Sequence, residues 1–301
     1  MLAGMWSDSR RNHNNRGDAI MAYNYKLIRI EKQDRIAIAT VDAPPINIIT
    51  TELFAELMQL SLEVEADEDL AVFILRSAHP DFFLAHFDVS AILRFPIGAP
   101  AERSAELNTY HAMCERFRTM AKVTIAQIEG RAGGGGSELA MSFDLRYGVR
   151  GKTRINQMEV PLGILPGGTG TQRLPRLIGR GRAIEVILGG DDLDAETAER
   201  WGYLDRIFAA HEIGPWVDRL AARIASFPIE AVRAAKAAVC ASDLPLQQGL
   251  LEEAYLFQTL LRNPSAQRNM AHFLANGGQT REGELKVNDL SAALGRGEKA
   301  V

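Results

Sequence analysis

A run of four glycines between a strand-like segment and a helix-like segment is the feature that most constrains the fold. Val123–Ile128 is a short apolar run with β-branched residues, which is typical of a buried strand. Gly130–Gly136 follows as a glycine-rich turn, and Ser137–Phe143 has the composition of a helix. A strand that passes through a tight turn into a helix is the repeating unit of an α/β core.

The flanking sequence continues this alternation up to about Arg180, after which helices dominate. Period-2 and period-3.6 patterns with capping residues predict these elements. The expected strands are Tyr25–Ile30 and Arg35–Val41 (a hairpin), Ala71–Arg76 and Leu145–Val149. The expected helices are Thr51–Ala66, Asp88–Leu93, Ala101–Met120, Gly181–Leu188, Ala195–Trp201, His211–Ser226, Glu230–Ala241, Leu246–Leu261 and Ser265–Ala275.

Four parts follow from this pass along the chain. Residues 1–20 are polar and aperiodic and are expected to be a disordered extension, with Met21 as the first residue of the fold. Residues 21–210 are the expected α/β core, and 211–280 a helical C-terminal region. Residues 281–301 are expected to be a polar tail.

Composition excludes several classes of function. The chain has 301 residues, 47% of them hydrophobic, and a formal net charge of -4, which does not favour nucleic-acid binding. It contains no apolar run of membrane-spanning length. Cys114 and Cys240 lie far apart without metal-ligand spacing, so we expect reduced thiols, a cytoplasmic location and no metal site.

The glycine run is suited to binding negative charge. Free amides at a helix N-terminus favour a phosphate or a developing oxyanion, although a tight structural turn would need the same glycines. A phosphate-binding loop requires Lys followed by Ser or Thr, but Ser137 and Glu138 follow here. A dinucleotide-binding fingerprint also fits poorly, because its last glycine position falls on Glu138.

Three segments together resemble the enoyl-CoA hydratase/isomerase (crotonase) family. They are Phe82–Val89, Ile128–Ala140 and Asn156–Leu174. The resemblance extends from about Tyr25 to Ala275 and is strongest in Gly130–Asp144 and Glu159–Leu174. It implies an α/β fold with a crotonase-like (ClpP/crotonase) ββα spiral core and a helical C-terminal trimerisation region. It also implies an acyl-CoA thioester substrate, no further cofactor, and a homotrimer or dimer of trimers.

The resemblance assigns roles to four positions. The backbone N–H groups of Phe87 and Gly135 would form an oxyanion hole for the thioester oxygen. Glu138 would deprotonate water for attack on Cβ, and Glu159 would protonate Cα. We expect the helix dipole to favour ionised Glu138, and an apolar setting before Val160-Pro161-Leu162 to raise the pKa of Glu159.

The same comparison indicates further substrate- or CoA-binding positions: Asn47, Ala85, His86, Asp88, Gly134, Pro161, Gly167, Phe273 and Arg281. Two of the matched positions depart from the family pattern. His86 stands where a glycine is usual, and Phe87 where a small residue is common. The cationic cluster that often follows Phe273 is reduced here to Arg281 and Lys286.

Several alternatives remain open at this level. An enoyl-CoA isomerase would need one proton shuttle at Glu159, and His86 keeps a hydratase-lyase, decarboxylase or thioester hydrolase possible. From another class, the chain could be a non-catalytic binding protein on the same scaffold. His79, His111 and His211 are expected to be surface residues, and Arg173 and Arg176 to form ion pairs.

Overall fold

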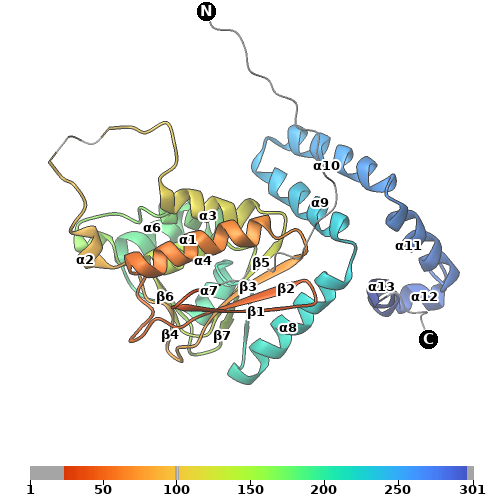
Figure 1. Cartoon of the computed structure of the whole chain (residues 1–301), viewed down its shortest axis with the longest axis horizontal. Coiled ribbons are helices and arrows are strands. Elements are labelled where there is room, and N and C mark those ends of the chain that lie inside the picture. Colours follow the sequence, from red (N-terminus) through yellow and green to blue (C-terminus); the bar gives the residue numbers. More distant parts are fainter. Residues whose placement is uncertain (1–23, 99, 101, 297–301) are drawn as a thin grey trace, which may run out of the picture.

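The computed structural model describes residues 24–98, 100 and 102–296. The predicted N-terminal extension and the predicted start of the fold at Met21 lie outside these residues. Within them the chain forms two sheets covered by helices, followed by a helical C-terminal part (Figure 1).

The larger sheet has six strands in the order β1-β2-β3-β5-β7-β10. β1 and β2 form an antiparallel hairpin, and the other neighbours pair in parallel. β3 is buried along most of its length, which is why it is a continuous apolar run in the sequence. The strands are β1 (Ile28–Gln33), β2 (Ile36–Val41), β3 (Val72–Ser77), β5 (Val123–Ile128), β7 (Leu145–Val149) and β10 (Arg206–Phe208).

The smaller sheet has the order β4-β6-β8-β9, and only β9 is antiparallel to its neighbour. The chain alternates between the two sheets, from β3 to β4, from β5 to β6 and from β7 to β8. This alternation is the expected ββα spiral. The strands are β4 (Phe82–Leu84), β6 (Arg131–Gly133), β8 (Arg154–Asn156) and β9 (Leu193–Asp194), and they are too short to show a clear period-2 pattern.

Helices cover both faces of the larger sheet. α1 packs beside α3 on one face, and α8 packs across β2, β3, β5 and β7 on the other (Figure 1). Apolar residues on the two faces form two separate core clusters. The helices of this part are α1 (Thr51–Ala66), α2 (Val89–Ile92), α3 (Thr109–Thr119), α4 (Gly134–Ala140), η1 (Val160–Leu162), α5 (Gly170–Ile178), α6 (Arg180–Gly189), α7 (Ala195–Trp201) and α8 (Ala210–Ser226).

Two predicted helix starts in the core are wrong. The helix predicted from Ala101 begins at Thr109, because the side chain of Asn108 accepts a hydrogen bond from the His111 nitrogen at 2.8 Å and caps it there. The helix predicted from Ser137 begins at Gly134, inside the glycine run. Of the four glycines, Gly133 therefore ends β6, and the other three begin α4.

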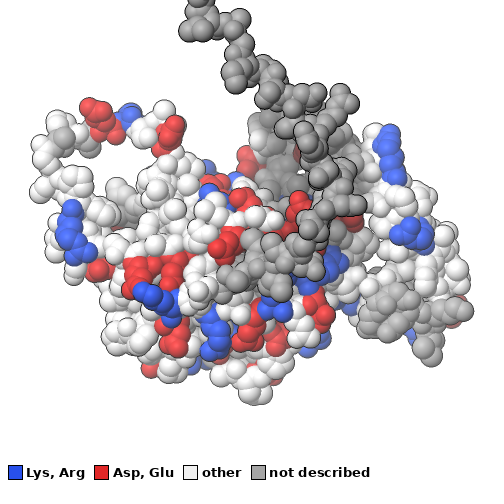
Figure 2. Space-filling model, in the orientation of Figure 1, with Lys and Arg blue, Asp and Glu red and all other residues white. Residues whose placement is uncertain are grey.

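The C-terminal helices α9 (Ile229–Cys240), α10 (Leu246–Leu261) and α11 (Pro264–Ala275) form an arm that extends away from the sheets (Figure 1). No residue of these three helices is buried. Lys236 holds the start of the arm to the core through Asp144 at 2.8 Å. The visible part of α10 and α11 is mostly uncharged, whereas acidic and basic side chains are interspersed near α1 and β1 (Figure 2).

The predicted polar tail is wrong for residues 281–296. This segment forms α12 (Arg281–Leu285) and α13 (Val287–Arg296). A short 3-10 helix, η2 (Ala241–Asp243), lies earlier, between α9 and α10. Leu290 and Ala293 of α13 are buried, and α13 contacts α8 and α11. A narrow apolar stripe is therefore enough to fold this mostly polar segment back onto the chain.

Candidate active site

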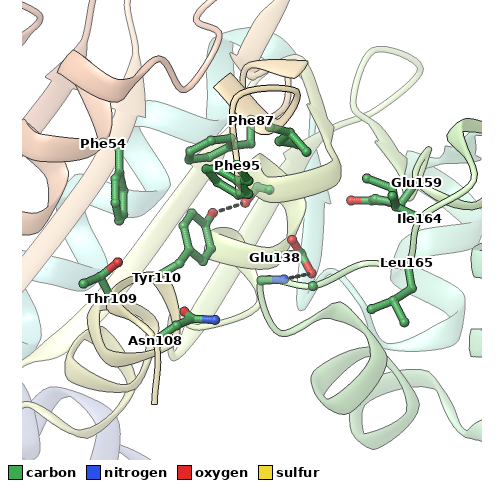
Figure 3. Close-up of a pocket in the computed structure, with 14 residues that line it drawn as sticks. Phe54, Phe87, Phe95, Asn108, Thr109, Tyr110, Glu138, Glu159, Ile164 and Leu165 are labelled. Carbon is green, nitrogen blue, oxygen red and sulfur yellow. Dashed lines mark hydrogen bonds between the residues drawn. The ribbon is translucent and has the colours of Figure 1, made fainter. Parts of the chain in front are cut away.

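A cavity of about 360 Å³ lies where α1, α3, α4 and the loop before α5 meet. Its wall is mostly apolar, but both glutamates picked out in the sequence also line it. In Figure 3 the aromatic side chains lie on one side, Glu159 with Ile164 and Leu165 on the other, and Glu138 between them. The lining residues are Phe54, Phe87, Ile92, Phe95, Asn108, Thr109, Tyr110, Gly135, Glu138, Glu159, Ile164, Leu165, Gly167 and Gly168.

Two main-chain N–H groups lie close together at the edge of this cavity. Ile49 donates to His86 at 2.8 Å and accepts from Asp88 at 3.0 Å, so the N–H of the intervening Phe87 points to the opposite side. Gly135 is the second residue of α4, and its N–H has no acceptor within the helix. A Cβ at position 135 would lie 3.4 Å from the Phe87 nitrogen, so the two residues are adjacent.

Glu138 is held by main-chain donors from a distant part of the chain. Its side chain is 3% exposed, and Oε1 accepts from the nitrogens of Gly168 at 2.8 Å and Gly170 at 2.7 Å. Thr169 between them has a φ of 140°, a strained conformation that lets both amides point at one oxygen. The carboxylate therefore lies at the N-terminus of α5.

The expected effect of the helix dipole on Glu138 needs correction. Because α4 starts at Gly134, Glu138 lies beyond the first turn, where the dipole of its own helix has little effect. Burial raises the pKa of Glu138, and the backbone donors from Gly170, Gly168 and Thr169 oppose this rise.

Glu159 lies between β8 and η1 and is 8% exposed. Its Oε2 is buried and has no hydrogen-bond partner among the described residues. Burial, and secondly the charge of Glu138, raise the pKa of Glu159 to about 7. The direction of this shift is the one expected from the sequence.

The family model for enoyl-CoA hydratase/isomerase matches residues 31–280. The chain belongs to the enoyl-CoA hydratase/isomerase family. It is 32% identical over 254 residues to a probable enoyl-CoA hydratase of Mycobacterium leprae, covering 83% of this chain and 95% of the relative. It is also 32% identical over 215 residues to a crotonyl-CoA hydratase of Syntrophomonas wolfei, covering 71% and 81%.

A solved structure confirms the crotonase-type fold. A crystal structure of an enoyl-CoA hydratase subunit from Geobacillus kaustophilus matches with a TM-score of 0.76 and 30% identity. The match covers 83% of this chain and 96% of that one.

Three other predicted site residues of this crotonase-family chain have mainly supporting contacts. The Asn47 side chain is 1% exposed; it accepts from the Ala43 nitrogen at 2.8 Å and donates to Ser77 Oγ at 2.8 Å. Ala85 donates its N–H to the Asn47 oxygen at 3.1 Å, and Asp88 caps α2 by accepting from the Ser90 nitrogen at 2.8 Å. These contacts hold the segment that presents the Phe87 N–H.

The remaining predicted residues near the cavity surround Glu159 and the loop before α5. Gly134 has a φ of 42°, and a Cβ there would lie 3.0 Å from Glu159 Oε1 and 3.3 Å from His86 Cβ. The ring of His86 turns back, with Nδ1 2.9 Å from the Phe87 oxygen. Pro161 lies in η1, and Gly167 lines the cavity.

Phe273 and Arg281 are not brought to this cavity by their own chain. They lie in α11 and α12, at the opposite side of the molecule from α2, which borders the cavity (Figure 1). Their expected contact with CoA stays a prediction. The arm carries them away from the core.

Sequence reasoning missed the aromatic side of the site. Tyr110 donates its hydroxyl hydrogen to the Gly135 oxygen at 2.6 Å, and its ring stacks on Phe54 at 5.6 Å between centroids. His111, expected at the surface, lies 2.7 Å through Nε2 from the Gly167 oxygen. An Asn cap followed by Thr-Tyr-His was the available signal, but a helix start alone does not identify a site.

Other expectations concern the surroundings. Arg173 forms an ion pair with Glu115, as predicted. Among residues 24–98, 100 and 102–296, no group of three or more His, Cys, Asp or Glu side chains is arranged to hold a metal ion. Within the same ranges, no helix has both the length and the apolar character needed to cross a bilayer.

Proposed function

We propose that this chain is an enoyl-CoA hydratase that adds water to a 2-enoyl-CoA thioester. The observation that carries the proposal is the pair of buried carboxylates, Glu138 and Glu159, lining one cavity with two adjacent main-chain amides. Relatives named as enoyl-CoA and crotonyl-CoA hydratases support the substrate class.

The environments of the two carboxylates suit them to different roles. Burial raises the pKa of Glu138, but two backbone N–H bonds to Oε1 oppose this rise and favour the ionised form, so we assign Glu138 as the base. Glu159 has a pKa of about 7 and retains a proton in a large fraction of molecules at neutral pH, so it is the acid. The charge on Glu138 favours the protonated form of Glu159, so the pair tends to share one proton.

The reaction then proceeds with a balanced transfer of protons. Glu138 takes a proton from water as its oxygen bonds to Cβ, and the π electrons of the double bond move toward the thioester oxygen. The N–H groups of Phe87 and Gly135 stabilise that oxygen, and one such donor contributes about 10²–10³-fold in acyl-transfer enzymes. The enolate collapses as Glu159 gives its proton to Cα. Exchange with solvent then removes the proton from Glu138 and returns one to Glu159.

The surrounding segments suit the thioester end of the substrate. Ala85, His86 and Asp88 lie beside the Phe87 amide. Asn47 holds this segment through hydrogen bonds to the main chain of Phe83 and Ala85. We assign Gly134, Pro161 and Gly167 to the opposite side of the thioester, near Glu159. Beyond the CoA of its substrate, the scheme needs no cofactor, because both proton transfers use side chains of this chain.

The arm supports assembly into a homotrimer or a dimer of trimers. It exposes large apolar side chains, which in a stable protein usually mark a contact with another chain. Phe273 and Arg281 would then contact CoA bound to a neighbouring copy. The exposed residues include Val239, Leu246, Leu250, Leu251, Tyr255, Phe257 and Leu274. The free thiols Cys114 and Cys240 suit a cytoplasmic location.

A panel of enoyl-CoA thioesters of increasing chain length tests the proposal. Loss of the conjugated enoyl absorbance, with a mass gain of one water in the product, is the expected result. Migration of the double bond without a change in mass would show an isomerase, which needs only Glu159. Release of free CoA would show a hydrolase, and either outcome would reject the proposal.

A further inference from the structure

Tyr110 touches both halves of the proposed catalytic machinery. It is the second residue of α3, and its hydroxyl donates to the Gly135 oxygen at 2.6 Å. Gly135 supplies one of the two amides of the proposed oxyanion hole. Glycine has more backbone freedom than any other residue, so a bond that fixes the Gly135 oxygen also limits rotation of the preceding peptide unit, which carries the Gly135 N–H.

The ring of Tyr110 also lies against the loop that binds Glu138. A Cβ at Gly168 would lie 2.8 Å from Tyr110 Cε1 and 2.5 Å from Glu138 Oε2. The ring edge and the carboxylate therefore contact the same point of the main chain. The Gly168 N–H is one of the two donors to Glu138.

Tyr110 is itself well fixed. Its ring stacks on Phe54 at 5.6 Å and meets Phe87 edge to face at 6.0 Å. Asn108 caps the helix turn that carries it, and His111 of the same turn reaches the Gly167 oxygen at 2.7 Å. Burial raises the pKa of Tyr110 well above its usual range, so the hydroxyl remains a neutral donor.

We propose that Tyr110 is a positioning residue that holds the Gly135 amide and the Glu138-binding loop in register with each other. Its hydroxyl fixes Gly135, and its ring fixes Gly168. The inference rests on the proposed function, because it concerns the oxyanion hole and base of that reaction.

The Tyr110→Phe variant tests the role of the hydroxyl, because it keeps the ring. We expect kcat for hydration to fall about tenfold or more, since small misplacements of catalytic groups cost up to about 10²-fold, with KM changing less than about threefold. Tyr147→Phe is the matched control; this tyrosine packs on Phe208 in the larger sheet, and its variant should keep wild-type kcat.

A spectroscopic measurement reports on the oxyanion hole directly. A 4-dimethylaminocinnamoyl-CoA thioester absorbs at longer wavelength as its carbonyl is polarised, so its bound spectrum measures how well the two amides point at the oxygen. We expect a red shift in the wild-type protein and in Tyr147→Phe. A smaller shift is expected in Tyr110→Phe, measured at saturating protein.

The outcomes separate this inference from the proposed function. If wild-type protein neither hydrates enoyl-CoA nor shifts the probe, the proposed function fails. If it does both, and Tyr110→Phe keeps wild-type kcat and probe shift, the positioning role is overturned while the proposed function stands. A lower melting temperature with unchanged kcat and shift would also overturn it, because Tyr110 would then be only structural.

Discussion

The cavity region and the C-terminal arm differ in how far their residues are buried within one chain. All seven residues of α4, which carries Gly135 and Glu138, are buried, whereas no residue of α9, α10 or α11 is. Every group that the proposed chemistry uses comes from the core of a single chain. The arm leaves apolar side chains exposed. The predicted CoA-binding residues Phe273, in the arm, and Arg281, in α12, lie far from the cavity. We infer that catalysis belongs to the core and that assembly and CoA binding depend on the arm.

The strongest test of the core is Glu138→Gln. Glutamine keeps the size of the side chain but cannot take a proton from water, so we expect kcat to fall about 10³-fold, within the range known for positioned bases. Loss of enoyl absorbance measures the rate. Glu185→Gln, an exposed change on α6, is the control and should keep wild-type activity. A Glu138→Gln variant with near wild-type rate would remove the base from the scheme.

Gly135→Ala tests the oxyanion hole with one methyl group. The new Cβ would lie 3.2 Å from Phe87 Cβ and 3.4 Å from the Phe87 nitrogen, where the thioester oxygen must enter. We expect kcat to fall about 10²-fold, as for loss of one donor. Gly181→Ala is the matched control, because a Cβ there meets nothing within 4 Å. Equal activity of the two variants would place the oxyanion site elsewhere.

The pH dependence tests the acid. If protonated Glu159 delivers the proton, kcat should fall above pH 7, roughly tenfold per unit, because its pKa is about 7. The folded state holds this proton at higher pH than the unfolded chain, so its stabilising effect is present at pH 4 and is lost as pH rises through 7.

Removing the charge should reverse that loss of stability. We expect Glu159→Gln to raise the free energy of unfolding by about 3 kcal/mol at pH 8 relative to its effect at pH 4, since one pKa unit corresponds to about 1.4 kcal/mol. Urea unfolding at the two pH values measures this. An equal effect at both would show that Glu159 titrates normally in the folded protein.

The arm gives the smallest expected change in catalytic rate. Tyr255→Glu places a charge on the exposed face of α10, so we expect sedimentation to show a smaller assembly. KM for the CoA thioester should rise while kcat stays within about twofold. Gln248→Glu, an exposed polar position on the same helix, should change neither. A loss of kcat as large as that of Gly135→Ala would contradict the division between core and arm.

The sequence was most informative for the parts of the site that lie in short continuous segments of the chain. The glycine run, Glu138 and Glu159 could be recognised because each lies in a short segment with its own pattern. The larger sheet except β10, and most long helices, were also predictable, since their apolar periodicity is strong. Family membership at about 32% identity agrees with that interpretation.

The parts that could not be predicted depend on contacts between distant segments. Phe54 and Tyr110 reach the cavity from α1 and α3 only because the spiral brings these helices together. The donors to Glu138 come from residues 30 and 32 positions further along the chain, which no local pattern indicates. Likewise, α13 folds against α8 through a few apolar residues in a segment that composition suggests is a tail.

The two amides on Glu138 Oε1 make the strength of this base depend on the loop before α5 rather than on α4. Both donors come from a strained stretch around Thr169, so a shift of that loop by an ångström would lengthen both bonds together. The carboxylate would lose the two largest contributions that offset its burial, and its affinity for protons would increase. Substitutions in this loop would therefore alter the reactivity of Glu138 without touching the glutamate or the substrate.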